Sequence, residues 1–329
     1  MAQENKAQQD KAQKNIQHHI RLLPEHLQGN GAIGRYILLP GCPGRAKMLS
    51  EMFDIYEEAI ITPRQNNTYL GKLKCPELGR DIDVAVTSTG MGPASTEIVV
   101  SELLSAGGKR FLRVGTSGSC QYRKIRVGSM VIATGAVRDE NTSRHYMPVE
   151  YPAIAHKDWV DSLVKASYKL GMEARTFTGI VHTKDSLYAR EIGMGPMKES
   201  NRQYKHLLER GNVVSSEMES AALFVISSTA RTTDISAETD KSADIPADST
   251  SEHGGYRKGK NTAGFVWPVS LKEAMLHPEY EIKAGSVLAI IGADDAFASE
   301  EEEKAAVRDV CRLAIEGIKE IAMLELKQR

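Results

Sequence analysis

The sequence of 329 residues lacks the features that mark membrane, secreted and nucleic-acid-binding proteins. No apolar run approaches the roughly 18 residues that a membrane-spanning helix needs. The N-terminus is polar and has no apolar signal-peptide core. The formal net charge is −1, whereas proteins that bind nucleic acids usually carry a basic excess. We therefore expect a cytoplasmic protein that has neither a membrane nor a nucleic acid as its partner.

Cysteine is also sparse, with four residues and no spacing of the kind that holds zinc. This pattern predicts reduced thiols and no metal site. Cys42 and Cys120 lie beside glycine-rich turns, so one of them could be reactive, but the sequence supplies no dedicated base for either thiol. The other two are Cys75 and Cys311.

What the chain does contain is a regular alternation of apolar, strand-like runs with helix-like stretches. Strands are expected over 35–41, 82–92, 109–118, 128–137 and 285–295. Helices are expected over 44–53, 93–107, 157–171, 215–228 and 299–327. The alternation predicts an α/β fold with three αβα layers, in which helices cover a central mixed, largely parallel sheet.

The pattern indicates a single domain over residues 16–329. Residues 1–15 are polar and low in complexity, which predicts a disordered tail. Residues 229–262 are rich in Ser, Thr, Asp and Lys and almost free of large apolar side chains. Because the strand and helix pattern resumes after them, we interpret these residues as a polar insertion on the domain surface.

Glycine turns follow three of the predicted strands, at Gly41, at 90–92 and at 115–118. Ligands of such folds bind at the carboxyl ends of strands, so these turns predict the site. Arg113 lies inside the apolar strand that precedes the third turn. A guanidinium costs several kcal/mol to bury unless an anion or a carboxylate pairs with it. We therefore expect Arg113 to face a bound anion.

Five motifs carry a family resemblance: "LLPGCPGRAKML", "STGMGPASTEIVVSEL", "FLRVGTSGS", "KDSLY" and "EMESAAL", in this order. Together they resemble the nucleoside phosphorylase family, and its uridine phosphorylase branch most of all, over about 19–227 and 284–325. The resemblance implies a nucleoside phosphorylase-like fold and a pentosyltransferase of pyrimidine salvage. Its expected reaction converts uridine and phosphate to uracil and ribose 1-phosphate. Phosphate is then a co-substrate, no cofactor is needed, and catalysis rests on positioning and electrostatics.

The resemblance also implies a phosphate site. Gly41 and Arg45 match its first turn, and Arg113 and Thr116 match its strand arginine and the threonine that follows. Arg64 matches an arginine that the neighbouring subunit lends. Arginine suits this task because its planar fork donates two hydrogen bonds to phosphate oxygens. Arg113 is also expected to act in catalysis.

The ribose site implied by the resemblance centres on Glu219, a catalytic residue that would hold both ring hydroxyls. Met218 would pack against the sugar, Glu217 opens the same motif, and His19 would bind the 5′-hydroxyl across the subunit boundary. From the residues alone, Ser216 and Glu219 also fit a capping box, in which Glu219 only caps its own helix. The family role is preferred because the other motifs accompany it.

Two residues that cross to a neighbour, His19 and Arg64, imply a homodimer as the minimum active unit. A hexamer built from dimers is the alternative, ranked second because the insertion at 229–262 could block its contacts. Relatives also bind a cation at the dimer interface. Gln65 stands where those relatives have an acidic ligand, so this cation is doubtful here.

The base site departs most from the family pattern. Uridine-specific relatives pair the uracil edge with a glutamine and an arginine, and neither has a clear match here. Arg190 could donate to the uracil carbonyls, or the insertion could supply Arg257. The expected base-binding residues are Ser117, Gly118, Leu187, Arg190 and Glu191.

Three other functions stay open at this point. A purine nucleoside phosphorylase could use Asp294 or Asp295 to protonate the leaving base, although both residues also fit an acidic N-cap of the last helix. A hydrolytic nucleosidase would have little use for three phosphate-facing arginines. A non-catalytic nucleoside-binding protein remains possible because Cys42 replaces the usual aspartate of the phosphate turn and Leu187 the usual aromatic residue.

Overall fold

A computed structural model of the chain describes residues 16–230, 281–293 and 296–327. The predicted tail 1–15 and positions 231–262 of the predicted insertion lie outside the described residues. So do Arg257, Asp294 and Asp295.

Strands and helices alternate much as the sequence predicts. The strands are β1 (Tyr36–Pro40), β2 (Ile55–Ile60), β3 (Thr68–Cys75), β4 (Arg80–Thr87), β5 (Arg110–Ser119), β6 (Met130–Asp139), β7 (Ala153–Ile154), β8 (Thr176–Lys184), β9 (Ser215–Glu217), β10 (Lys283–Ala293) and β11 (Ala296–Phe297). The helices are α2 (Pro43–Ser50), α3 (Pro93–Ser105), α4 (Lys157–Lys169), α5 (Lys198–Arg210), α6 (Ser220–Thr229) and α8 (Glu300–Leu326). Among these described segments, no helix is both long enough and apolar enough to cross a bilayer.

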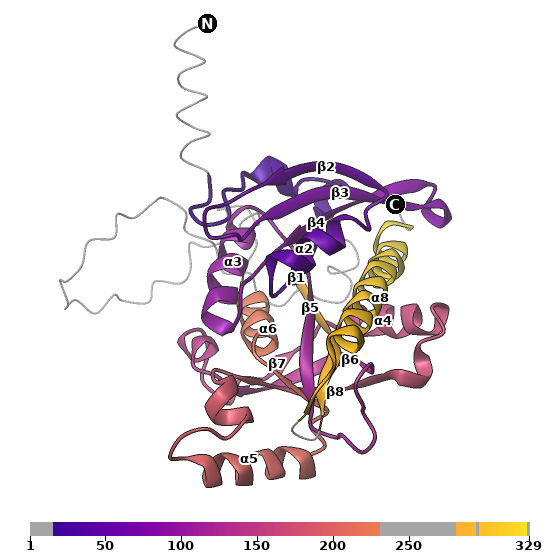
Figure 1. Ribbon diagram of the computed structural model, residues 1–329. Coiled ribbons are helices and arrows are strands. Elements are labelled where there is room, and N and C mark those ends of the chain that lie inside the picture. The colour runs from indigo at the N-terminus through magenta and orange to yellow at the C-terminus, as the bar shows by residue number, and fades with distance from the viewer. Residues whose placement is uncertain (1–15, 231–280, 294–295, 328–329) are drawn as a thin grey trace, which may run out of the picture.

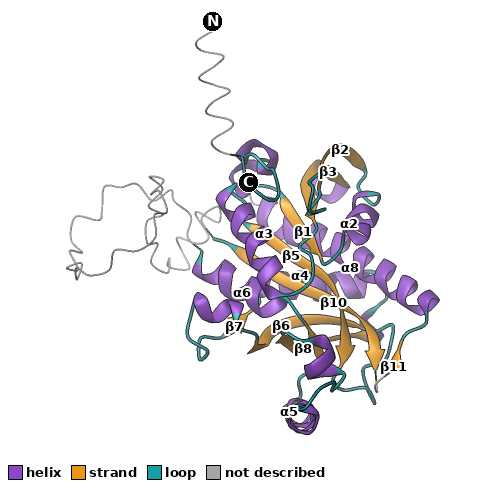
Figure 2. Ribbon diagram, turned by 60° about the vertical axis from the view of Figure 1, so that its left-hand side comes forward, coloured by secondary structure: helices purple, strands orange, loops and turns teal. Residues whose placement is uncertain are grey.

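The predicted three-layer architecture is confirmed, with helices on both faces of the sheet (Figures 1 and 2). Successive side chains of a strand point to opposite faces, so β5 feeds both cores. Leu112 and Val114 belong to a core shared with α2, α4 and α8, whereas Phe111 belongs to a second core shared with α3 and α6. Arg113 therefore lies on the same face as α3 and α6.

The sheet is mixed, as predicted, but its antiparallel share is larger than the alternation indicated. β4, β1, β5 and β10 run parallel to one another. β2, β3 and β4 form an antiparallel meander at one margin, and β10 meets β6 antiparallel. The strands β2, β3, β7, β8, β9 and β11 have no counterpart among the sequence-based expectations.

Five strands close into a ring. β5 pairs with β10, β10 with β6, β6 with β8, β8 with β9, and β9 with β5 again. The last contact places Ser216 of β9 beside Gly118 of β5. The C-terminal half of β5 consequently lies against the C-terminal ends of β8 and β9, where the predicted site residues gather.

Candidate active site

Arg113 is buried in β5, with 5% of its surface exposed, and it contacts two carboxylates. Its Nε donates to Glu217 Oε2 at 2.9 Å, and its Nη2 forms an ion pair with Glu219 Oε2. Its Nη1 is buried and has no hydrogen-bond partner among the described residues. The buried arginine therefore has the negative partners that the sequence required, but they come from its own chain. One donor nitrogen is left over.

Glu217 organises the start of α6. Its carboxylate accepts the backbone N–H of Glu219 at 2.9 Å and that of Ser220 at 3.0 Å, and it also accepts the hydroxyl of Thr183. Burial by itself would raise the pKa of Glu217. The positive charge of Arg113 and these hydrogen bonds outweigh burial and hold the pKa below its ordinary value.

Glu219 does not form the capping box that its spacing from Ser216 suggests. It stands at the N-cap of α6 without a side-chain capping bond, and Ser216 belongs to β9, so the helix begins later than predicted. The carboxylate instead accepts the backbone N–H of Gly92 at 2.6 Å, and φ of Gly92 is 88°. Burial raises the pKa of Glu219; Arg113 opposes this shift, and the charge of Glu217 adds to it.

The first turn of α2 places a second guanidinium, that of Arg45, near Arg113. Arg45 Nη1 donates to the carbonyl of Val114 at 3.2 Å, and Arg45 Nε is buried without a partner among the described residues. Burial lowers the pKa of Arg45, and the nearby charge of Arg113 adds to that effect. A Cβ placed on Gly41 would lie 3.9 Å from Arg113 Nη1. The structure thus brings together Gly41, Arg45 and Arg113.

Thr116 and Cys42 complete this side of the cluster. Thr116 is partly exposed in β5 beside Ala289 of β10, three residues beyond Arg113 along the strand. Cys42 is exposed at the N-cap of α2, where its thiol makes no capping hydrogen bond. Among the described residues, no group of three or more His, Cys, Asp or Glu side chains is placed to hold a metal.

Within one chain, His19 contacts α3, and Arg64 is exposed to solvent. His19 Nδ1 lies 2.6 Å from Glu102 Oε1 on α3, and its backbone N–H also contacts that carboxylate. Glu102 follows Gly92 by ten residues, which corresponds to about 15 Å along the helix axis. Arg64 is exposed on the turn between β2 and β3.

The predicted base-binding residues divide into two groups. Leu187 opens a π-helical turn over Leu187–Glu191 and is half-buried, and Ser117 Oγ is buried without a partner among the described residues. Arg190, in contrast, is held by its own chain. Its Nε and Nη2 bind Asp139 at 2.7 and 2.9 Å, and its Nη1 donates to Asn201 Oδ1 at 2.9 Å.

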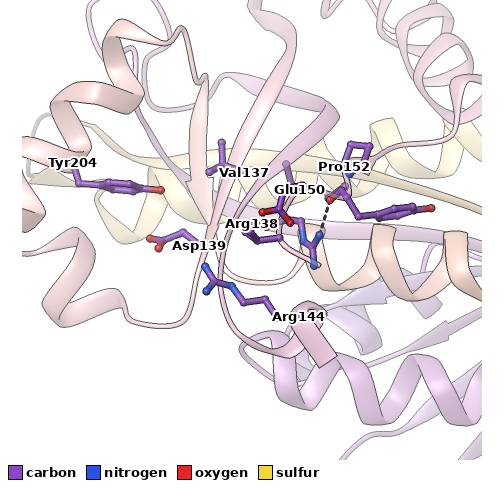
Figure 3. A pocket seen from close by; sticks show the side chains of 11 residues that line it. Val137, Arg138, Asp139, Arg144, Glu150, Pro152 and Tyr204 are labelled. Atoms are coloured by element: carbon purple, nitrogen blue, oxygen red, sulfur yellow. Dashed lines mark hydrogen bonds between the residues drawn. The ribbon is translucent and has the colours of Figure 1, made fainter. Parts of the chain in front are cut away.

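Arg190 also lies over the ring of Tyr204, at 4.3 Å from its centroid. Tyr204 and Asp139 line a cavity of about 500 Å³ that Arg144 and Glu150 also border (Figure 3). All three nitrogen positions of Arg190 are therefore engaged beside that cavity, and we withdraw this residue as a donor to the base. Arg190 pairs with Asp139 because a guanidinium forms stronger hydrogen bonds with a charged carboxylate than with a neutral carbonyl.

The sequence did not indicate that Thr183 and the N–H of Gly92 contact the two glutamates. It also did not indicate that His182 and Lys184 are buried near the ends of β8 and β9. The available signal was the segment "VHTK", which places three polar residues at the end of an apolar run. Such a strand end beside "DSLY" is typical of a site.

A family model described as the phosphorylase superfamily matches residues 35–246, which is more than half of the chain. The chain belongs to the phosphorylase superfamily. This assignment confirms the resemblance to nucleoside phosphorylases that the five motifs indicate.

Curated relatives of this phosphorylase are 33–40% identical to it over the segments that align. It is 35% identical over 223 residues to a uridine phosphorylase of Thermococcus kodakarensis, covering 67% of this chain and 75% of the relative. It is 40% identical over 203 residues to a uridine phosphorylase of Treponema pallidum, covering 60% and 74%. A guanosine phosphorylase of Halorubrum lacusprofundi is 33% identical over 204 residues, covering 62% and 76%.

A solved structure shares the fold of this phosphorylase. The crystal structure of a uridine phosphorylase from Vibrio fischeri superposes with a TM-score of 0.62 at 19% sequence identity, covering 92% of this chain and 96% of that one.

Proposed function

We propose that this phosphorylase cleaves uridine with inorganic phosphate and releases uracil and ribose 1-phosphate. The observation that carries the proposal is a pair of buried guanidinium nitrogens, Arg113 Nη1 and Arg45 Nε, that have no partners among the described residues. Arg113 Nη1 lies 3.9 Å from the position that a Cβ on Gly41 would take, and the same guanidinium pairs with Glu219. Several relatives of this chain are named uridine phosphorylase, which supports uridine as the nucleoside.

Inorganic phosphate fits the space beside Gly41. A buried donor without an acceptor costs about 1–3 kcal/mol, so two such donors on neighbouring guanidinium groups support an anionic ligand. Phosphate oxygens would accept from Arg113 Nη1 and Arg45 Nε, with the hydroxyl of Thr116 as a further donor. The absence of a side chain at Gly41 leaves room for the anion next to Arg113.

The sugar fits beside Glu219. A carboxylate accepts from two vicinal hydroxyls, and Glu219 is already aligned by the N–H of Gly92 and by Arg113. Met218, half-buried between the two glutamates, would contact the ribose ring. Glu217 would act indirectly, since its contacts with Arg113, with Thr183 and with the backbone at the start of α6 hold those groups in place.

The chemistry then follows from the charges. A phosphate oxygen bonds to the anomeric carbon as the bond from that carbon to the base nitrogen breaks, and the electron pair of the broken bond leaves with the base. The sugar passes through a state with oxocarbenium character. Arg113 and Arg45 hold the nucleophile, Glu219 faces the positive sugar, and no covalent bond to the protein is needed.

The active unit proposed here is a homodimer. His19 contacts Glu102, about 15 Å along α3 from Gly92, and Arg64 is exposed on a turn, which supports their proposed contribution to the site of a neighbour. A second copy that supplies both would add a guanidinium to the phosphate and an imidazole to the 5′-hydroxyl.

The test is the release of free base from uridine, inosine, guanosine and adenosine, with and without phosphate. Release of uracil that requires phosphate supports the proposal. Release without phosphate would show a hydrolase, and release from none of the four would show a nucleoside-binding protein. Faster release from guanosine than from uridine would favour the activity for which the Halorubrum relative is named.

A further inference from the structure

A cavity of about 500 Å³ lies between the end of β6, the loop that follows this strand, and α5 (Figure 3). Asp139 belongs to β6, Arg144 and Glu150 belong to the loop, and Tyr204 belongs to α5. Small-molecule sites have volumes of about 300–1,000 Å³, so the cavity is large enough for one ligand. None of the lining residues is part of the proposed phosphate, ribose or base sites.

A buried arginine holds the loop wall of this cavity in place. Arg138 of β6 is 7% exposed, and its Nη1 donates to the carbonyls of Pro148 and Tyr151. Its Nη2 donates to the carbonyls of Ser143 at 2.9 Å and Met147 at 2.8 Å, and its Nε donates to Ser143 Oγ at 2.9 Å. The wall therefore has its shape before any ligand arrives, which reduces the cost of ordering on binding.

The charged residues of the lining differ in whether their own chain supplies a partner. Asp139 is paired with Arg190 at 2.7 Å and with His182 at 2.9 Å. The side chains of Arg144 and Glu150, both exposed, make no hydrogen bond or ion pair with any residue that the structure describes. The guanidinium of Arg144 thus keeps all of its N–H donors for a ligand.

The available guanidinium and an aromatic ring border the same space. In Figure 3 the Arg144 side chain points toward the side of the cavity where Asp139 and Tyr204 lie. Burial raises the pKa of the Tyr204 hydroxyl and the charge of Asp139 adds to this shift, whereas Arg190 and Arg144 oppose it. Arg144 is therefore near enough to Tyr204 to act on its hydroxyl, and one small ligand can contact both side chains.

We propose that this cavity binds a small aromatic anion, whose ring packs against Tyr204 and whose acid group pairs with Arg144. A phosphate and a carboxylate both suit the second contact, because the planar fork of a guanidinium donates two hydrogen bonds to either group. Glu150 accepts from an N–H or hydroxyl of the same ligand. A neutral nucleoside lacks the acid group, and inorganic phosphate lacks the ring, so neither makes both contacts.

Asp139 connects the cavity to the candidate active site. Its carboxylate holds Arg190 in the π-helical turn and lies 2.9 Å from one ring nitrogen of His182. The other ring nitrogen of His182 is 2.9 Å from Ser216 Oγ, on the strand that leads to Glu219. The cavity is thus a second site that borders the active site through one shared carboxylate.

The experiment is calorimetric titration of uridine 5′-monophosphate and, separately, of orotate into the full-length protein. Both probes carry a pyrimidine ring, but the acid group is a phosphate in the first and a carboxylate in the second. Arg144→Gln and Tyr204→Leu remove the two proposed contacts. Arg202→Gln is the matched control, because Arg202 is another exposed arginine, at 79%, and lies on α5 like Tyr204. Arg45→Ala reports on binding at the proposed phosphate site instead.

Wild type is expected to bind at least one of the two probes, and the probe that binds identifies the acid group. Arg144→Gln should weaken this binding about 10- to 100-fold, as the loss of charge-assisted hydrogen bonds does, and should keep the wild-type kcat/KM for uridine. Tyr204→Leu should weaken it about tenfold, because a stacking surface is lost. Arg202→Gln and Arg45→Ala should bind the probe as wild type does.

Three results would overturn the inference: binding of neither probe by wild type, equal affinity in wild type and Arg144→Gln, or a loss in Arg45→Ala with none in Arg144→Gln. The last result would place the probe in the proposed active site. If Tyr204→Leu does not fold, Arg144→Gln decides alone, because Arg144 is exposed and has no partner among the described side chains. The titration needs no turnover, so it gives the same answer whether or not the proposed function holds.

Discussion

Replacement of Arg113 by glutamine should damage both stability and activity, for reasons that can be separated. The variant leaves Glu217 and Glu219 buried with no positive partner, although both face Arg113 in the wild type. Removal of one member of a buried ion pair costs about 3–5 kcal/mol of unfolding free energy. Activity should fall at least about a hundredfold as well, because one preorganised anion donor is lost.

Arg110 provides the matched control, since it is a buried arginine on the same strand. Arg110 is the first residue of β5, three residues before Arg113, and it pairs with Glu325 at 2.9 Å. Arg110→Gln should lose comparable stability but keep kcat/KM and the KM for phosphate in the folded protein. Urea unfolding and steady-state kinetics measure the two effects. A folded Arg113→Gln protein with normal turnover would refute the assignment, and so would an Arg110→Gln protein with the same kinetic defect.

The stability difference between wild type and Arg113→Gln should depend on pH. In wild type the pKa of Glu217 is lowered, so its contribution is present above the unfolded-state pKa and is lost as pH falls through the folded one. In the variant, burial dominates and raises the pKa, so the penalty is present at neutral pH and disappears as the carboxyl takes up a proton. The difference is therefore largest near neutrality and shrinks towards the ordinary glutamate pKa of about 4.3. A difference that grows on acidification would contradict this account.

Three further predictions concern separate parts of the site. Arg45→Ala should raise the KM for phosphate about tenfold or more, as the loss of a charged hydrogen bond does, with little change in the KM for uridine; an unchanged phosphate KM would remove Arg45 from the site. Glu219→Gln keeps the oxygen that Gly92 contacts but weakens the hydrogen bonds to the sugar hydroxyls. Its kcat/KM should therefore fall about 10- to 100-fold with uridine and less with 2′-deoxyuridine. Equal losses of kcat/KM on both nucleosides would contradict ribose binding. If Arg64 crosses to a neighbour, equal mixing of inactive Arg64→Ala and Arg113→Gln subunits should restore about a quarter of wild-type activity, because half of the dimers carry one intact site of two. No recovery after demonstrated subunit exchange would refute the shared site.

Much of the fold, and the proximity of Gly41, Arg45 and Arg113, could be predicted from local sequence. The apolar strand around Arg113 and the glycine turn at 41 are short-range patterns, and the structure places both where ligands of this fold class bind. What local sequence could not show was the partner of the buried arginine. Glu217 is 104 residues away along the chain, so only the closure of β5 against β9 brings it there.

Long-range contacts also decide between local patterns that the sequence left open. Ser216 and Glu219 match a capping box, yet the Ser216 hydroxyl is taken up by His182, Lys184 and Glu191, and the segment pairs as a strand. A strand of three residues has too few alternating positions to show a period. Arg190 has the position of a base donor, but Asp139, 51 residues earlier, binds it first.

The ring of β5, β10, β6, β8 and β9 sets a limit on how this protein can move. A closed circle of strands has no free edge, so a shift in any one of them must be absorbed by the other four. The spacing between the arginine on β5 and the lysine that ends β8 is thus rigid. Entry and exit of small molecules must depend on segments outside the circle, such as the π-helical turn over Leu187–Glu191. A rigid site of this kind is selective because it excludes ligands of the wrong shape, and not because it changes its own shape to fit them.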